Sequence, residues 1–256
     1  KVLSGAYTPT AGSIEVDGTT YQKLDPTLSK QLGINIVYQE NDLVPSMDVV
    51  ENIYVGNEKV KGPGLVDYKA METETRRQMS ELGIDLKLST KIENLSVSDQ
   101  QFVKILKALS VQPRVLIMDE PTSMFNVEDA AKVLELTKRI TEKGIGIIYI
   151  SHFLNEVVQI ADRITVIRDG AVVRTYTNEN RDTPITTITQ DMVGRPVDMF
   201  YDKEKCPIGE VMLEVKDLQL TKDSPKVSFT VRKGEIVGFS GMVGSGRTEM
   251  VRALVG

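Results

Sequence analysis

The sequence predicts an α/β fold whose core is a mostly parallel sheet, accompanied by an antiparallel β part and a helical subdomain. Short apolar segments alternate along the chain with amphipathic helical segments, which is the pattern of a parallel sheet with helices on its faces. Residues 114–120 and 146–152 are continuous hydrophobic runs, as expected for strands covered on both faces. Between them, a helix is expected to begin at Asn126, with Asp129 in the capping turn, and to end at Gly144.

Antiparallel and helical segments surround this core. Residues 13–22 predict a hairpin that turns at Asp17-Gly18, and residues 33–40 predict a buried strand. The region of about 45–110 contains apolar residues at helical spacing among polar ones, which indicates an inserted helical subdomain. Residues 162–177 predict a second hairpin.

The pattern divides the chain into three parts. Residues 1–177 are expected to form a first domain. Residues 178–209 are polar and contain prolines, which predicts a linker with a short helix near 186–193. Residues 210–256 restart the strand pattern, so a second domain is expected to begin there.

Composition limits the classes of function. At 256 residues with 41% hydrophobic content, the chain is expected to fold. The net charge of −5, with acidic and basic residues interspersed, excludes the basic surface of a nucleic-acid-binding protein. A single cysteine, Cys206, and the absence of a signal peptide favour a reducing cytosol. No apolar run approaches about 18 residues, so a membrane connection is expected only through a partner protein.

Two acidic residues follow a predicted buried strand. Asp119 and Glu120 lie at its carboxyl end, where α/β folds hold ligands. One carboxylate would hold Mg²⁺ and the next would orient an attacking water. Alone, the pair is better explained as two solvated acids, and a lone histidine is more often a packed structural residue. Gln39 after an earlier strand, and His152, the single histidine, after a later one, favour the functional interpretation.

A glycine-rich loop lies near the end of the chain, in the sequence GMVGSGRT at 241–248. Backbone N–H groups at Gly241, Gly244 and Gly246 would close around phosphate oxygens at a helix start. Arg247 stands where the usual pattern has lysine, and its forked guanidinium binds phosphate without reproducing the lysine geometry. We therefore expect nucleotide binding without efficient hydrolysis at this loop. Two hydroxyl residues complete it, Ser245 and Thr248.

Taken together, these motifs resemble those of the ABC-type ATPases, which are P-loop NTPases. VLIMDEPTS at 115–123 is similar to the Walker B strand with its catalytic glutamate, and SMFNVED at 123–129 is similar to the D-loop. LSVSDQQ at 95–101 resembles the signature loop, usually written LSGGQ. By the same resemblance, Gln39 is the Q-loop glutamine and His152 is the switch histidine.

The resemblance implies a role for each candidate residue. Glu120 and His152 would be catalytic, and Mg²⁺ would be held at Asp119, Gln39 and Thr248. ATP would be bound by ten residues, namely Gln39, Ser96, Ser98, Gln100, Gly241, Gly244, Ser245, Gly246, Arg247 and Thr248.

The signature loop departs from the family pattern. Val97 and Ser98 replace the glycines that could approach a γ-phosphate. Asp99 in the first helical turn suits the helix dipole by about 0.3–1 kcal/mol, yet it opposes a bound phosphate. Ser98 with Gln101 can serve equally as a plain capping box. The resemblance implies that this loop and the loop at 241–248 face each other across a weakened site, while the acidic pair serves a competent one.

The two ends of the chain match each other. KVLSG at residues 1–5 matches RALVG at 252–256 in type and place, so the chain spans about one repeat of 252 − 1 = 251 residues. We therefore expect the first domain to lack its own P-loop. We further expect residues 226–256 to complete its sheet, within the chain or by exchange between two chains. Strand 235–239 would then join the sheet of 146–150, and residues 1–5 would be displaced or frayed.

More narrowly, the tandem arrangement and the altered signature resemble the fused two-domain ATPases of bacterial carbohydrate importers, such as those for ribose, galactose or xylose. This implies an ATP-hydrolysing subunit at the cytoplasmic face of the plasma membrane. Its direct partners would be membrane permease subunits and a second ABC domain. A periplasmic or extracellular sugar-binding protein would be reached through the permease, and no nucleic acid is expected as a partner. Two alternatives stay open, a soluble non-transport ABC switch protein and a catalytically inert fragment. The sequence does not identify the sugar, because the permease and the binding protein choose it.

Overall fold

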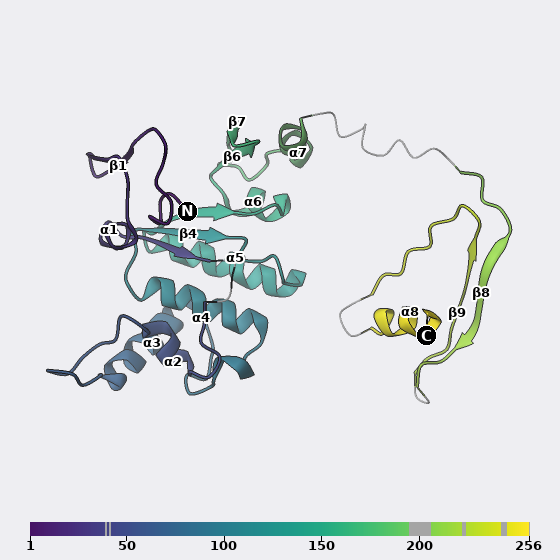
Figure 1. The fold of residues 1–256 in the computed structure, drawn as a ribbon, viewed down its shortest axis with the longest axis horizontal. Coiled ribbons are helices and arrows are strands. Elements are labelled where there is room, and N and C mark those ends of the chain that lie inside the picture. The colour runs from purple at the N-terminus through teal and green to yellow at the C-terminus, as the bar shows by residue number, and fades with distance from the viewer. Residues whose placement is uncertain (39, 41, 195–205, 222–223, 242–244, 256) are drawn as a thin grey trace. The chain divides into compact units, whose positions relative to one another are not determined.

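The computed structural model in Figure 1 describes residues 1–38, 40, 42–194, 206–221, 224–241 and 245–255. The chain forms two compact units, Lys1–Arg195 and Pro196–Gly256. Among the described residues, no helix is both long and apolar enough to cross a membrane. Two of the predicted site residues, Gln39 and Gly244, lie outside the described residues.

The first unit is built on a parallel sheet with the strand order β3-β4-β5. β4 (Val115–Asp119) is central, between β3 (Ile34–Val37) and β5 (Gly146–Ile150). It pairs in parallel with both neighbours, so each connection between these strands must cross over the sheet. The predicted parallel α/β core is therefore confirmed.

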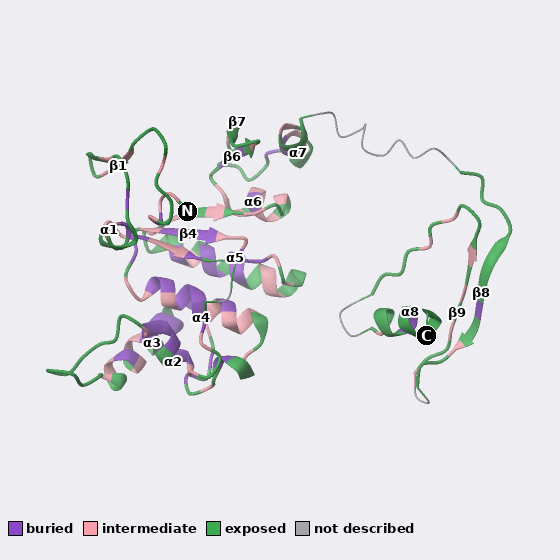
Figure 2. Cartoon of the chain, in the orientation of Figure 1, coloured by how far each residue is buried: buried purple, intermediate pink, exposed green. Residues whose placement is uncertain are grey.

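The connection from β3 to β4 contains the helices expected in the region of 45–110. They are α2 (Val49–Tyr54), α3 (Tyr68–Leu82), the short 3₁₀ helix η1 (Ile92–Asn94) and α4 (Val97–Leu109). α2 contacts both α3 and α4, and α4 contacts β3. Buried residues are concentrated along these helices and β4 in Figure 2, and they form one hydrophobic cluster. Burial of this shared apolar surface holds the helices onto the sheet.

Asn52 is a fully buried polar residue of α2. Its Nδ2 donates to the carbonyls of Val44 and Asp48, both at 3.0 Å, and its Oδ1 accepts from the Val44 N–H at 2.7 Å. Asp48 also caps α2 through a capping box with Glu51. One buried amide therefore fixes the loop that leads from β3 into the helical region.

The helix predicted to start at Asn126 is α5 (Val127–Glu142), which connects β4 to β5. The Asn126 side chain accepts the Asp129 N–H at 2.8 Å, which confirms the predicted cap. Gly144, just beyond the last turn, has φ of 81°. The buried residues of the helix are Val133, Leu134, Leu136, Thr137 and Ile140.

The first predicted hairpin is confirmed. β1 (Ile14–Val16) pairs antiparallel with β2 (Thr19–Tyr21), and both turn residues, Asp17 and Gly18, have positive φ. The short helix α1 (Pro26–Gln31) then leads into β3. The hairpin is thus set by the local turn sequence.

The expectation that residues 1–5 are displaced or frayed is wrong. The hydroxyl of buried Ser29 donates to the Leu3 carbonyl at 2.7 Å. Gly5 has φ of 74°, and a Cβ at this position would lie only 2.2 Å from the carbonyl carbon of Asp25. The absence of a side chain at Gly5 therefore lets this segment pack directly against the start of α1.

β5 differs from its prediction of burial on both faces. Ile147 and Tyr149 pack against the main hydrophobic cluster, whereas Ile148 and Ile150 are 40% and 45% exposed. Successive side chains of a strand point to opposite faces, and β5 is an edge strand of the described sheet. Only one face of β5 is therefore well covered in the first unit.

The predicted second hairpin and short helix are both present, but the helix packs within the first unit and not in a linker, since Ile188 is buried with Ile164 and Val166. The second hairpin is formed by antiparallel β6 and β7 and turns at Asp169-Gly170, and a short helix follows. The elements after β5 are α6 (Leu154–Ile160), β6 (Arg163–Arg168), β7 (Ala171–Thr177) and α7 (Ile185–Val193).

The described residues of the second unit form an antiparallel pair and a helix. β8 (Val211–Leu218) pairs with β9 (Val227–Arg232), and α8 (Arg247–Val255) follows. Residues 235–239 are predicted to form a strand, but they adopt no regular secondary structure, because no described strand pairs with them. The addition of this segment to the sheet of β5, within the chain or by exchange between two chains, stays a prediction.

Removing the buried amide in Asn52→Ala should lower the free energy of unfolding by about 2–3 kcal/mol, because Val44 and Asp48 lose buried hydrogen-bond partners. Urea denaturation measures this directly. Asn57→Ala, at an exposed position just after α2, serves as the control and should change the free energy by no more than about 0.5 kcal/mol. Equal effects of the two substitutions would contradict a structural role for the Asn52 amide.

Candidate functional site

The carboxyl ends of β4 and β5 lie side by side, because Asp119 and Ile150 are partners in the parallel register. The Glu120 N–H donates to the Ile150 carbonyl at 2.9 Å, which extends the pairing one residue beyond β4. Asp119 and Glu120 therefore lie at the same edge of the sheet as His152, two residues after β5. The acidic pair and the histidine, predicted from separate strands, meet at one edge as expected.

Glu120 and His152 are in direct contact. His152 Nδ1 lies 2.8 Å from Glu120 Oε1, and this is a hydrogen bond. The second carboxylate oxygen, Oε2, is buried and lies at the same distance of 2.8 Å from His152 Nδ1, although it makes no hydrogen bond with the described residues. The Glu120 side chain is 18% exposed, whereas the His152 side chain is 60% exposed. The pair thus combines a sheltered carboxylate, both of whose oxygens lie beside Nδ1, and an imidazole that faces solvent.

The backbone of Glu120 is strained. Its φ is 50°, in the left-handed region that residues with a side chain rarely adopt. Such a conformation costs about 1–2 kcal/mol and persists only where the surroundings impose it. The bond from its N–H to Ile150 and the bond from its side chain to His152 are the local contacts that hold it.

Three residues are predicted to hold a metal ion, and Asp119 is the only one of them among the described residues of the first unit. It is partly buried at the end of β4. No cluster of three or more His, Cys, Asp or Glu side chains that could hold a metal exists in the described part of the chain. Mg²⁺ usually keeps waters and is bound by one or two carboxylates together with substrate phosphates. A single strand-end carboxylate therefore fits an Mg²⁺ ion that enters with a nucleotide.

Three residues that were not predicted lie next to the Glu120–His152 pair. Thr122 Oγ1 and the Tyr149 hydroxyl both donate to Glu156 Oε2, at 2.6 Å and 2.9 Å. Burial, followed by the hydrogen bond to the carboxylate, raises the pKa of Tyr149. Their positions in the sequence could have indicated them, because Thr122 follows Glu120 by two residues and Glu156 follows His152 by four.

The predicted signature loop forms the start of α4, and its cap differs from the prediction. Ser96, not Ser98, is the N-cap, since its Oγ accepts the Asp99 N–H at 3.1 Å. The hydroxyls of Ser96 and Ser98 lie 3.1 Å apart. Gln100 Nε2 donates to the carbonyls of Ile92 and Leu95, both at 3.2 Å. In this structure the loop's polar groups therefore order the loop itself.

The glycine-rich loop lies in the second unit. As predicted, it leads into a helix, since α8 begins at Arg247 and continues through Thr248. A Cβ at Gly241 would lie 2.6 Å from the Ser245 hydroxyl, so this glycine allows a close approach of the chain. Gly246 has φ of 83°, a conformation that also favours glycine. The described glycines of the loop thus adopt conformations that need glycine, and phosphate binding by the loop stays a prediction.

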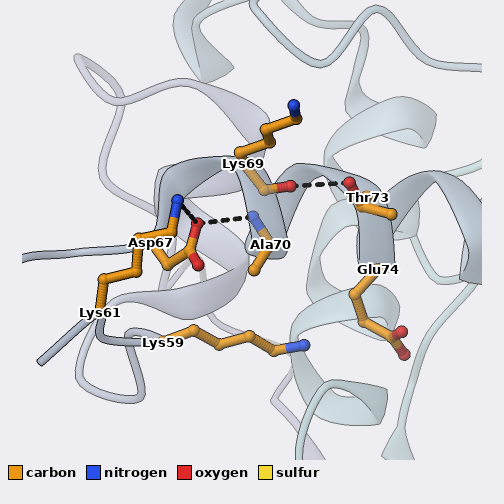
Figure 3. A pocket seen from close by; sticks show the side chains of 7 residues that line it. All are labelled: Lys59, Lys61, Asp67, Lys69, Ala70, Thr73 and Glu74. Carbon is orange, nitrogen blue, oxygen red and sulfur yellow. Dashed lines mark hydrogen bonds and ion pairs between the residues drawn. The ribbon is translucent and has the colours of Figure 1, made fainter.

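Two hollows lie away from the Glu120–His152 pair. The one in Figure 3 is a basic surface hollow at the start of α3, where Asp67 accepts the Ala70 N–H and pairs with Lys61. None of the predicted site residues lines it. The other is a groove of about 290 Å³ between β3, α4 and the end of α2, and its lining includes Tyr38, Asp42, Val55, Asn57, Lys104 and Lys107.

Two contacts shape this groove beside β3. Lys104 Nζ donates to the Glu40 carbonyl at 2.9 Å, and burial lowers the pKa of the Lys104 amine. Lys107 pairs with Asp42 at 3.0 Å. These bonds attach the residues around the predicted Q-loop position to α4, so the groove has a preformed wall.

Known proteins with similar sequences are ATP-binding import proteins. Residues 1–123 match the family described as ABC transporter. A ribose/galactose/methyl galactoside import ATP-binding protein of Burkholderia ambifaria, named as putative, is 41% identical over 257 residues, covering 100% of this chain and 49% of that protein. A ribose import ATP-binding protein of Streptomyces coelicolor is 40% identical over 256 residues, covering 100% and 49%. The chain spans about half the length of these curated relatives.

Solved structures with the same fold are ATP-binding cassettes. A nucleotide-free cassette from an ABC transporter aligns with a TM-score of 0.62 and 19% identity, covering 79% of this chain and 81% of that one. A dimeric cassette bound to ADP and phosphate aligns with a TM-score of 0.58 and 23% identity, covering 69% and 77%. At these identities the likeness concerns the fold.

The strain at Glu120 gives a stability prediction. Glu120→Gly and Glu120→Ala both remove the carboxylate, but only glycine relieves the positive φ, so the glycine variant should be more stable by about 1 kcal/mol. The control is the same pair at exposed Glu128 in the first turn of α5, where glycine should instead be less stable by about 1 kcal/mol. Thermal or urea unfolding measures both differences. The same sign at both positions would contradict the strain.

Proposed function

Because the chain belongs to the ABC transporter family, we propose that it is the ATP-hydrolysing part of a bacterial importer for a sugar of the ribose or galactose class. One observation carries the proposal of hydrolysis. The sheltered carboxylate of Glu120 has both oxygens 2.8 Å from His152 Nδ1, at the ligand-holding edge of a parallel sheet. The class of sugar rests on the names of the relatives.

In the proposed reaction, water attacks the γ-phosphate of ATP and the products are ADP and phosphate. Glu120 orients the water and accepts a hydrogen bond from it at its carboxylate. His152 contacts this carboxylate through Nδ1 and presents its exposed ring toward the γ-phosphate. The contact between the two groups holds them in place, which reduces the reorganisation needed for the reaction.

The remaining predicted residues are assigned to nucleotide binding. Asp119 and Gln39 would hold an Mg²⁺ ion bound to ATP, and this ion would neutralise phosphate charge. The loop at 241–248 binds phosphate through its backbone, where Arg247 supports binding more than hydrolysis and Thr248 would contact a metal ion. In the signature loop, contacts to nucleotide are assigned to Ser96, Ser98 and Gln100.

The relatives are about twice the length of this chain, so the proposal concerns the full-length protein. In that protein a second ABC domain is the partner of the first, and ATP binding closes the two. The proposed further partners are permease subunits in the plasma membrane, and the protein would lie at the cytoplasmic face of that membrane. A sugar-binding protein would be an indirect partner, through the permease. After hydrolysis the two domains would open, and the helical region would transmit this movement to the permease.

The decisive substitution for hydrolysis is Glu120→Gln in the full-length protein. Loss of the general base should lower the steady-state ATPase rate by about 10²–10⁴-fold while ATP still binds. The matched control is Glu142→Gln, which makes the same chemical change at an exposed position at the end of α5 and should leave turnover unchanged. An undiminished rate in Glu120→Gln would remove Glu120 from this role.

The groove beside β3 is the proposed docking site for a permease segment. Its apolar and charged lining lies next to the predicted Q-loop position, and Asn57 is exposed in its wall. Asn57→Trp should fill the groove and weaken copurification of the full-length protein with its permease. Basal ATPase activity, which does not use the groove, should persist. Normal assembly of Asn57→Trp with the permease would place the docking site elsewhere.

A further inference from the structure

A single carboxylate oxygen joins the two chain segments that carry the proposed catalytic pair. Glu156 Oε2, on α6, accepts the Thr122 hydroxyl at 2.6 Å and the Tyr149 hydroxyl at 2.9 Å. Thr122 lies in the turn after β4, and Tyr149 lies on β5. The two hydroxyls are themselves 3.5 Å apart, so the three side chains form one compact group.

The group is sheltered and its donors are fixed. Thr122 is 2% exposed, and Tyr149 and Glu156 are partly buried. Burial and the adjacent carboxylate raise the pKa of Tyr149, so its hydroxyl keeps its proton at neutral pH and donates to Glu156. Hydrogen bonds from hydroxyls to a carboxylate are stronger than those between neutral groups, and the short bond from Thr122 agrees with this.

Short backbone connections link this group to the catalytic pair. Thr122 is two residues after Glu120, and the next N–H, that of Ser123, donates to the Glu120 carbonyl at 3.3 Å. Tyr149 precedes Ile150, whose carbonyl accepts the Glu120 N–H. Glu156 itself lies in the first turn of α6, four residues after His152. A displacement at Glu156 would therefore move the backbone on both sides of the Glu120–His152 contact.

We propose that Glu156 is a positioning residue, which holds the turn after β4 against β5 and α6 so that Glu120 and His152 remain in contact at 2.8 Å. Its carboxylate contacts Thr122 and Tyr149, and no contact to nucleotide or to the attacking water is assigned to it. This inference rests on the proposed function for its effect on catalysis. Its effect on the geometry of the pair is independent of that function.

The geometric part is tested on the chain itself, which contains a single histidine. With ¹³C-labelled histidine, the ring signal of His152 reports on its contact with Glu120 at one fixed pH. Glu156→Ala should move this signal toward the one measured for Glu120→Ala, and Glu156→Gln, which keeps an acceptor oxygen, should leave it close to wild type. Gln159→Ala, exposed on the same helix, is the control and should not move it. A wild-type signal in Glu156→Ala would overturn the inference.

The catalytic part is tested in the full-length protein. Glu156→Ala should lower kcat for ATP hydrolysis by roughly ten- to a hundredfold, as expected for misplaced catalytic groups, with little change in KM or in the affinity for an ATP analogue. Glu156→Gln should restore most of the rate. If Glu156→Ala does not fold, Thr122→Val and Tyr149→Phe, which each remove one donor at nearly constant shape, should give the same selective loss of kcat.

The two possible failures are distinguishable. Absence of ATP hydrolysis by the wild-type full-length protein would contradict the proposed function, and the His152 signal would still decide the geometric inference. Wild-type hydrolysis with an unchanged kcat in Glu156→Ala would contradict the positioning role alone. A parallel fall in kcat, nucleotide affinity and melting temperature in all three variants would show a general structural role and would also overturn the inference.

Discussion

The parallel pairing of β4 with β5 is the constraint on which the site depends. Its register places Asp119 beside Ile150, and the hydrogen bond from the Glu120 N–H to the Ile150 carbonyl carries that register one residue further. Because both strands end at the same edge, the residues that follow them are brought together without any contact between their own loops. The helices of the β3–β4 connection and α5 maintain the pairing, since their shared hydrophobic cluster includes residues of β4.

The same edge contains the features that folding alone does not favour. Glu120 adopts a positive φ and holds its carboxylate largely sheltered from solvent, each of which costs free energy. Both costs fall on one residue, and both have a use in the proposed reaction, since the strained backbone directs the carboxylate toward His152 and the sheltered carboxylate orients a water. This concentration at one site is what distinguishes it from the ordinary end of a strand.

Much of this arrangement could be predicted, because it depends on local sequence. The two hairpins follow from their Asp-Gly turns, α5 follows from the cap at Asn126, and the meeting of Glu120 with His152 follows from the parallel order of the strands. Other features depend on contacts between distant segments. The cap at Ser96, the exposed face of β5 and the bonds to Glu156 each require knowledge of which segments pack together, which periodicity and propensity do not contain.

The central claim is that Glu120 and His152 form the hydrolytic edge of a nucleotide site. Its most direct test is a crystal structure of the full-length protein with Mg²⁺ and a non-hydrolysable ATP analogue. The account predicts a terminal phosphate oxygen within hydrogen-bonding distance of His152, roughly 2.6–3.2 Å, and a water held by Glu120 in line with that phosphate. An analogue bound with its terminal phosphate away from both residues would contradict the account.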